Sequence, residues 1–296
     1  MGKLVDSLKA LLPDRLHTDM QYVWRFGRPR NHRDPRTFHE LLIRKKVLDL
    51  PRYRELGELS DKYGVREFVA RTVGAEHLIP LIGVYDDVDE IDPATLPEAF
   101  VLKGTHGSGM NVIVADKASV DWDGVRATAR RWLATDYSRL YREAPYRAVP
   151  RRLVVEELLS GVAGAVPVDY KFFVFSGKAR LFEIDYSRFS RHMQAFFLPD
   201  GRRLAVDRGR AVPEVIPPLP SQLEEMVALA EKLGAGHEYV RVDLYDVGGR
   251  TYFGELTFYP SGALNLWRPP EFEYEMGAVW REGRAVGEEW VAGGAS

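Results

Sequence analysis

The sequence predicts an α+β fold whose sheets are mostly antiparallel. After residue 74, strand-like stretches alternate with helix-like stretches. Several neighbouring strands are separated only by short turns, such as Ser176-Gly177 and Gly248-Gly249, which are typical of hairpins. Hydrophobic residues make up 45% of the 296 residues and charged residues 28%, the balance of a globular protein rather than a disordered one. We therefore expect antiparallel sheets packed against helices.

The first 58 residues are predicted to form a helical, arginine-rich segment, broken at Pro29, Pro35 and Pro51. Within it, Thr37 to Leu50 has apolar residues at roughly helical spacing, and Thr37 is a suitable N-cap. A second helix is expected from Ser60 through Val73, ending near Gly74. The tail after Trp280 shows no clear pattern.

The central part of the chain is predicted to contain paired strands. Ala99 to Lys103 and Val112 to Val114 could form a hairpin over a glycine-containing loop. Helices are expected at Val125 to Ala134 and at Leu223 to Leu233, where Gly234 ends the second one. The other strands are expected at Arg152 to Glu156, Tyr170 to Phe175, Ala179 to Asp185, Tyr239 to Tyr245 and Thr251 to Phe258.

Composition excludes several classes of function. The chain has no cysteine, so disulfides, thiolate metal sites and thiol nucleophiles are all excluded. Its net charge of -2 gives no general attraction for nucleic acid. Apolar runs are of strand length, and we expect neither a signal peptide nor an integral membrane segment. A cytoplasmic location is the expectation, while the oligomeric state is left open.

A lysine followed by small residues forms the first candidate site, Lys103-Gly-Thr-His-Gly-Ser-Gly109. Small residues let backbone N–H groups approach an anion closely, and a lysine at the end of a strand adds charge, which suits a polyphosphate. The spacing is not that of a P-loop, and no Lys-Ser or Lys-Thr pair follows the last glycine. A flexible hairpin loop without function is an equally good interpretation.

Two carboxylates on successive strands form the second candidate site. The predicted turn at Gly248-Gly249 would place Asp243 and Glu255 near each other across the two strands. Neighbouring carboxylates repel unless a cation or proton lies between them, and oxygen ligands of this kind suit Mg²⁺. The alternative is an ordinary ion pair of Asp243 with Arg241 or Arg250.

Three weaker signals accompany these two sites. The strand around Val155 ends in Glu156 and Glu157, which could be no more than a solvent-facing strand exit. Lys62 and Arg66 are four residues apart on the expected helix, a spacing that is usual for a solvated face. Asp169 and Lys171 share one face of a strand and could form a simple ion pair.

The order of these motifs along the chain resembles that of the ATP-grasp superfamily. The residues within the motifs resemble its TupA-like branch, which is named for teichuronopeptide biosynthesis. The resemblance covers about residues 31 to 270. It is most specific in Val240-Arg-Val-Asp-Leu-Tyr245 and Tyr252-Phe-Gly-Glu-Leu-Thr-Phe-Tyr-Pro260, and it is also carried by Asp61-Lys-Tyr-Gly-Val-Arg-Glu-Phe68 and Asp169-Tyr-Lys-Phe-Phe-Val-Phe175. It implies an ATP-grasp fold of two α+β lobes that clasp ATP: residues 59–155 and residues 156–275, between a helical segment (1–58) and a tail (276–296).

The resemblance also implies roles for individual residues. Lys62, Lys103 and Lys171 are expected to bind ATP, the loop Gly107, Ser108 and Gly109 to close over its phosphates, and Glu156, Glu157 and Leu158 to receive adenine. Asp243 and Glu255 are expected to bind Mg²⁺. Thr257 occupies the position of a further metal ligand, which is asparagine in many relatives. Arg241 and Lys103 are the expected catalytic residues.

The activity that the resemblance implies is ATP-dependent joining of a carboxylate to an amine through an acyl phosphate. A small-molecule or sugar-linked carboxylate and an amine or amino acid are the expected substrates, as in cell-surface polysaccharide synthesis. Arg188 and His192 are candidates for substrate binding. Three alternatives stay open: an ATP-grasp kinase or phosphotransferase, a glycosyltransferase-like enzyme of polysaccharide assembly, and a non-catalytic binding module that keeps the fold. The intact set of lysines and carboxylates argues against the third.

Overall fold

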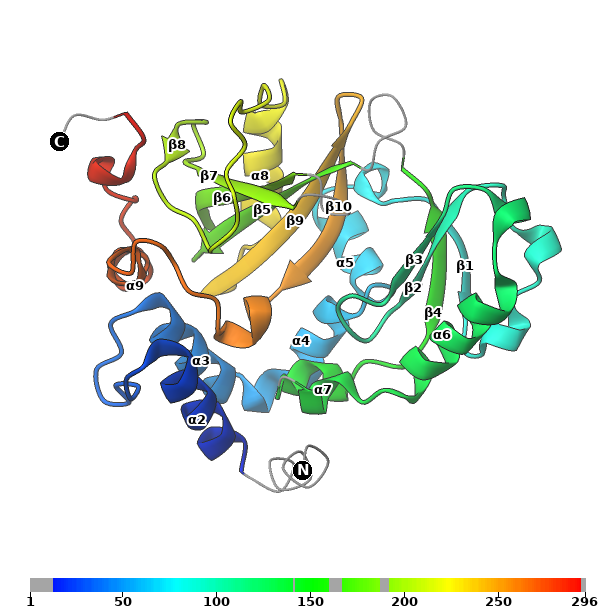
Figure 1. Ribbon diagram of the computed structural model, residues 1–296, viewed down its shortest axis with the longest axis horizontal. Helices are drawn as coiled ribbons and strands as arrows, with labels where there is room; N and C mark the ends of the chain where they lie inside the picture. Colours follow the sequence, from blue (N-terminus) through cyan, green and yellow to red (C-terminus); the bar gives the residue numbers. More distant parts are fainter. Residues whose placement is uncertain (1–12, 141, 160–166, 187–191, 294–296) are drawn as a thin grey trace.

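Two antiparallel sheets form the framework of the molecule, seen side by side in Figure 1. The computed structural model describes residues 13–140, 142–159, 167–186 and 192–293. Every pairing between its named strands is antiparallel. The expectation of an α+β fold with antiparallel sheets is therefore confirmed.

The first sheet has four strands in the order β1-β4-β2-β3. Their bounds are β1 (Leu81–Tyr85), β2 (Phe100–Gly104), β3 (Asn111–Val114) and β4 (Leu153–Glu157). Helix α6 (Trp122–Ala134) covers one face, where Phe100, Leu102 and Val155 join Ala129 in an apolar cluster. The hairpin predicted from Lys103 and its glycine loop is formed by β2 and β3.

The second sheet has six strands in the order β10-β9-β5-β6-β7-β8. These are β5 (Val168–Phe175), β6 (Lys178–Tyr186), β7 (Met193–Phe197), β8 (Arg203–Leu204), β9 (Tyr239–Val247) and β10 (Arg250–Thr257). Helix α8 (Leu223–Leu233) packs against β5, β6 and β9. The turn between β9 and β10 needs two left-handed residues, and Gly248 (φ 60°) and Gly249 (φ 81°) supply them without steric cost.

Helices from both ends of the chain pack together beside the second sheet. The N-terminal pair is α2 (Asp14–Phe26) and α3 (Phe38–Leu48), and α3 packs against α9 (Phe272–Glu282). Phe38 lies with Tyr239 and Trp280 in an aromatic cluster at this contact. Thr37 caps α3 as expected, in a capping box with Glu40.

The helix expected from Ser60 to Val73 is wrong at its start. Helix α4 (Tyr53–Ser60) ends there, and α5 begins only at Val65 and runs to Thr72. Between them, the Asp61 carboxylate accepts a hydrogen bond from the Tyr63 backbone N–H, which favours a turn over a helix. Lys62 therefore lies in a turn and not on a helix with Arg66. The strands β1, β7 and β8 were not expected.

The short helix α7 (Tyr137–Leu140) completes the named helices. Within the described residues, no helix is both long enough and apolar enough to cross a membrane.

Candidate active site

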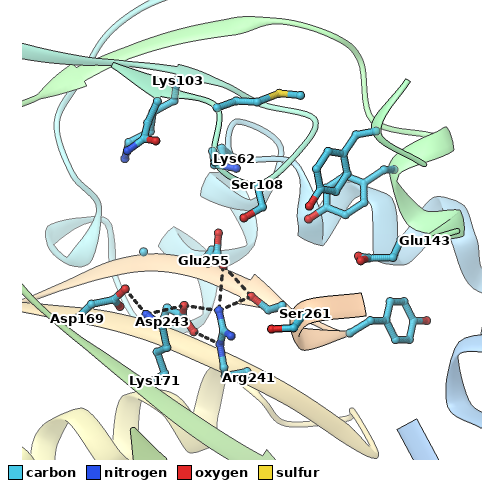
Figure 2. A pocket seen from close by; sticks show the side chains of 18 of the residues that line it. Lys62, Lys103, Ser108, Glu143, Asp169, Lys171, Arg241, Asp243, Glu255 and Ser261 are labelled. Carbon is cyan, nitrogen blue, oxygen red and sulfur yellow. Dashed lines mark hydrogen bonds and ion pairs between the residues drawn. The ribbon is translucent and has the colours of Figure 1, made fainter. Parts of the chain in front are cut away.

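A polar cavity of about 480 Å³ lies where residues from the two sheets and their loops meet. Figure 2 shows Lys62, Lys103 and Ser108 on one side of it and Arg241 and Glu255 on the other. We call the side formed by β5, β9 and β10 the floor, and the side formed by the β2–β3 hairpin and the α4–α5 turn the roof. The charged residues of the sequence motifs that line this cavity are Lys62, Lys103, Asp169, Lys171, Arg241, Asp243 and Glu255.

The floor carries the two carboxylates predicted to be neighbours. Glu255 is the register partner of Asp243, so the predicted adjacency across the hairpin is confirmed. Arg241 bridges them: it donates two hydrogen bonds of 2.7 Å to Asp243 and one of 3.2 Å to Glu255. It also donates to the Thr257 hydroxyl (3.1 Å), which itself donates to Glu255 (2.8 Å). The alternative interpretation, an ion pair of Asp243 with Arg241, is thus also present.

The two floor carboxylates differ in their affinity for protons. Burial raises the pKa of Asp243 to about 6, although Arg241 and Lys171 oppose this shift. Burial also acts on Glu255, but there the charges of Lys62 and Arg241 outweigh it and lower the pKa to about 2. Glu255 is therefore ionised at neutral pH, and Asp243 would be stabilised by a further positive charge.

Lys171 is a buried residue of the floor and lies among three carboxylates. It forms ion pairs with Asp169, with Asp185 (3.1 Å) and with Asp243 (3.6 Å). Burial alone would lower the pKa of Lys171, but these carboxylates outweigh it and raise the pKa well above its usual value. The lysine is thus held as a cation, and it pairs with carboxylates from three adjacent strands, β5, β6 and β9.

The roof presents two lysines. Lys103 forms an ion pair with Glu156 (2.5 Å), and Arg66 pairs with the other oxygen of the same carboxylate (3.1 Å). The Glu156 side chain thus pairs with one cation from β2 and one from α5. Lys62 donates a hydrogen bond of 2.5 Å to the Gly107 carbonyl and so ties the α4–α5 turn to the glycine loop. Burial lowers the pKa of Lys62.

The glycine loop packs tightly on one side. A Cβ atom at Gly107 would lie 2.7 Å from the Tyr137 ring, so only glycine fits there without displacing that ring. Ser108 and Gly109 line the cavity. His106 is buried and its Nε2 pairs with the Trp132 carbonyl, which gives it a packing role.

A smaller, largely apolar cavity adjoins the large one. Its lining includes Ile79, Val101, Leu158, Leu159 and Pro167, and it shares Lys103, Asn111 and Tyr245 with the large cavity. Of the three residues predicted to receive adenine, Glu157 and Leu158 lie in this lining, and Glu156 does not.

The two substrate-binding candidates have different outcomes. Arg188 lies outside the described residues. His192 pairs with Asp185 (2.7 Å), a partner of Lys171, and it is not among the residues that line the large cavity.

Several lining residues were given no role from the sequence: Tyr137, Glu143, Tyr146, Tyr259, Ser261 and Gly262. Of these, only Tyr259 lies within a quoted motif. All of them come from the segment after α6 and from the turn after β10, and no spacing in the sequence links the two. Ser261 adopts a positive φ of 52°, which is rare for a non-glycine residue and which its sequence context did not indicate.

The floor offers oxygen atoms of the kind that Mg²⁺ prefers. Asp243 and Glu255 offer oxygen atoms from adjacent strands, and Thr257 lies beside them. In the described part of the chain, no group of three or more His, Asp or Glu side chains could hold a metal ion. Two carboxylates and a hydroxyl cannot enclose an ion, so a Mg²⁺ ion bound here would complete its shell with phosphate and water oxygens.

Comparisons with known proteins identify one family. Residues 40–281 match the family model described as TupA-like ATPgrasp. No curated protein sequence matches the chain significantly.

Similar solved structures include a D-alanine–D-alanine ligase from Bacillus anthracis (20% identity, TM-score 0.40), which covers 75% of this chain and 63% of its own. The N5-carboxyaminoimidazole synthase from Aspergillus clavatus has 12% sequence identity and a TM-score of 0.39. The match covers 68% of this chain and 44% of the synthase. The ATP-grasp ligase PsnB, complexed with a variant precursor, Mg and ADP, has 13% sequence identity and a TM-score of 0.41. The match covers 82% of this chain and 64% of PsnB. The chain thus spans less than two thirds of each of these proteins.

Proposed function

The chain belongs to the TupA-like ATP-grasp family, and we propose that it is an ATP-dependent ligase that joins a carboxylate to an amine through an acyl phosphate. The observation that carries the proposal is the opposition of charges across the cavity. Lys62 and Lys103 face Asp243 and Glu255 from the roof, with Arg241 between the two carboxylates. A phosphate chain would fit between cations above and metal-binding carboxylates below.

The proposed adenine site is the small apolar cavity. Its side chains, such as Leu158 and Tyr245, suit a flat aromatic base. Because it shares Lys103 with the large cavity, a nucleotide with its base there would place its phosphates beside Lys103 and Lys62. In this arrangement the terminal phosphate would lie over the floor.

The proposed reaction needs alignment and charge neutralisation rather than a nucleophile from the protein. A substrate carboxylate oxygen attacks the terminal phosphorus of ATP, and ADP leaves with the electron pair of the broken P–O bond. The amine nitrogen then attacks the acyl carbon, inorganic phosphate leaves, and the amine gives up a proton. Arg241 would neutralise the transferred phosphoryl group, and Lys62 and Lys103 would hold the nucleotide. Mg²⁺ bound by Asp243 and Glu255 would supply further positive charge.

Exclusion of water is the role we propose for the glycine loop. An acyl phosphate hydrolyses readily, so the intermediate has to be shielded. The loop at Gly107 is already fixed on two sides, by the Lys62 ammonium group and by the Tyr137 ring. Its closure over a nucleotide would cover the cavity from the roof.

A hydroxamate screen tests this proposal. Protein, ATP and Mg²⁺ are incubated with hydroxylamine and a panel of amino acids, uronic acids and nucleotide-linked uronic acids, because the family name refers to cell-surface polymers that carry such groups. The expected result is an ATP-dependent hydroxamate from one carboxylate, with one ADP per product. A stable phosphoester would indicate the kinase alternative. Binding of nucleotide sugars but not of ATP would indicate the glycosyltransferase alternative.

A further inference from the structure

One end of the large cavity is not explained by nucleotide binding. The small apolar cavity meets the large one at Lys103, which marks the nucleotide end. Figure 2 shows Glu143 and Ser261 at the opposite end, beyond Arg241 and Glu255. Whatever binds there would meet the terminal phosphate from the side away from the base.

Glu143 is a buried carboxylate at this end. The residue is only 7% exposed, yet it lines the cavity, and its side chain points toward it in Figure 2. None of the described residues donates a hydrogen bond to its carboxylate or lies within ion-pair distance of it. Burying a carboxylate that accepts no hydrogen bond disfavours its ionised form, so a cation from the cavity that donates to it would stabilise that form.

The groups around Glu143 come from several parts of the chain. Burial raises the pKa of Glu143, the positive charge of Lys46 (α3) lowers it, and the negative charge of Glu255 (β10) raises it. Tyr146 and Tyr259 are uncharged at neutral pH, because burial raises the pKa of both well above its usual value. Burial raises the pKa of Glu143 itself to about 7, although the charge of Lys46 opposes this. The carboxylate is thus close to the point at which it can either hold or release a proton at neutral pH.

Aromatic rings form the wall beside this carboxylate. Tyr137 and Tyr146 pack edge to face, with ring centroids 4.8 Å apart, and both line the cavity. Ring faces attract cations, most strongly where water is excluded. A carboxylate beside aromatic rings favours a positively charged group and disfavours a second carboxylate.

We propose that this end of the cavity binds the amine substrate as its ammonium ion, with Glu143 as the group that receives the ammonium and then accepts its proton. Tyr137 and Tyr146 pack beside it. The inference rests on the proposed ligase function and names the substrate class for one half of the reaction. The carboxylate substrate then lies on the Arg241 side, because Glu143 repels it.

The proton transfer balances with the ligase reaction. The ammonium group gives one proton to a Glu143 oxygen, which frees the nitrogen lone pair. That pair forms the C–N bond, and the C–O bond to phosphate breaks with its electrons going to the phosphate. The second proton lost by nitrogen leaves with the phosphate, and Glu143 returns its proton to water after the product has left.

A binding experiment with a panel of amines tests this assignment. The probes are the common amino acids, glucosamine, ethanolamine and putrescine, each paired with its N-acetyl form. They are added to the protein with Mg²⁺ and a non-hydrolysable ATP analogue, and binding is followed by saturation-transfer NMR. We expect an amine of the panel to bind and its N-acetyl form not to bind. Glu143→Gln should weaken that amine by about tenfold or more, as expected for a lost charged hydrogen bond.

Three measurements separate this role from a structural one. The control Asp136→Asn, in the same segment but outside the cavity lining, should bind the amine normally. Glu143→Asp, which keeps the charge, should recover part of the affinity. In the unaltered protein, amine affinity should fall as the pH is lowered from about 8 to about 6, because Glu143 becomes protonated, and this dependence should vanish in Glu143→Gln.

The outcomes distinguish this inference from the proposed function. Failure of the ATP analogue to bind the unaltered protein would contradict the ligase function itself. If the analogue binds but no amine does, or if amines and their N-acetyl forms bind alike, the ammonium site is wrong. Equal amine affinity in folded Glu143→Gln and unaltered protein would also overturn it.

Discussion

Replacing Asp243 by asparagine removes one charge from the cavity floor and keeps the shape of the side chain. Asp243 accepts two hydrogen bonds of 2.7 Å from Arg241 and lies 3.6 Å from the Lys171 ammonium group. Asparagine keeps one acceptor, so the direct loss is about one charged hydrogen bond, worth about 1.5–3 kcal/mol. Lys171 keeps Asp169 and Asp185 as partners, so no buried cation is left unpaired. The free energy of unfolding should therefore fall by no more than about 3 kcal/mol.

The effect on metal-dependent nucleotide binding should be larger. In the proposed site, Asp243 is one of only two carboxylates that hold Mg²⁺, and phosphate oxygens complete the shell. We expect Mg²⁺ to strengthen binding of a non-hydrolysable ATP analogue by about tenfold or more in the unaltered protein, and hardly at all in Asp243→Asn. Calorimetric titration with Mg²⁺ and with a chelator measures this difference, and urea denaturation measures the stability.

A matched control and two outcomes make the test decisive. Asp246→Asn changes the same residue type on the same strand, outside the cavity lining, and should keep the Mg²⁺ dependence. Unchanged Mg²⁺ dependence in folded Asp243→Asn would refute the metal assignment. Tight binding of Mn²⁺ to the protein without nucleotide would refute the argument that phosphate oxygens are needed to complete the site.

Three further predictions concern other parts of the molecule. Glu40 is buried, but three backbone N–H groups and Arg28 outweigh this and lower the pKa of its carboxyl from 4.5 to about 2. The resulting stability is present above about pH 4.5 and is lost as the pH falls toward 2, so Glu40→Gln should cost about 3 kcal/mol at pH 7 in urea denaturation and much less at pH 3. No difference at pH 7 would contradict this. Lys103→Met should weaken the ATP analogue by about tenfold or more in calorimetry, with Lys117→Met, outside the cavity, as control; equal affinities would remove the main support for the phosphate site. Gly107→Ala should speed dissociation of a fluorescent ATP analogue in stopped-flow measurements because its Cβ meets the Tyr137 ring, and adding Tyr137→Ala should reverse the effect; a Gly107→Ala rate like that of the unaltered protein would contradict the packing argument.

The sequence predicted best what depends on neighbouring residues. The β9–β10 hairpin follows from alternating side chains around two glycines, and it fixes the adjacency of Asp243 and Glu255. The capping box of α3 is likewise encoded within four residues, from Thr37 to Glu40. In both cases the interacting groups are close in sequence, so local rules are sufficient.

Contacts between strands that no short turn connects, and contacts from segments without a motif, could not be predicted. The sequence suggested only a pair of Asp169 with Lys171, whereas Asp243 reaches the same lysine from β9, the neighbouring strand on one side. Glu143 reaches the cavity from a segment with no motif. Strand β1 contains Gly83 and is only partly buried, so its pairing with β4, rather than its own pattern, defines it.

The error at Lys62 has a local physical cause. The residues from Ser60 to Val73 have helical spacing, but the Asp61 side chain competes with the helix by accepting the Tyr63 N–H. Arg152 then pairs with Asp61 (3.0 Å), a contact over a long sequence separation that fixes the turn. This turn points Lys62 into the cavity, where a straight helix would have continued past it.

Transfer of a carboxylate oxygen to phosphate tests the central proposal most directly. The carboxylate that yields a hydroxamate is labelled with ¹⁸O and incubated with protein, ATP, Mg²⁺ and an amine, and the released phosphate is analysed by mass spectrometry. Formation of an acyl phosphate predicts that one labelled oxygen appears in the phosphate for each amide formed. Label that stays wholly in the organic product, or a phosphorylated product that accumulates without amide, would contradict the ligase mechanism.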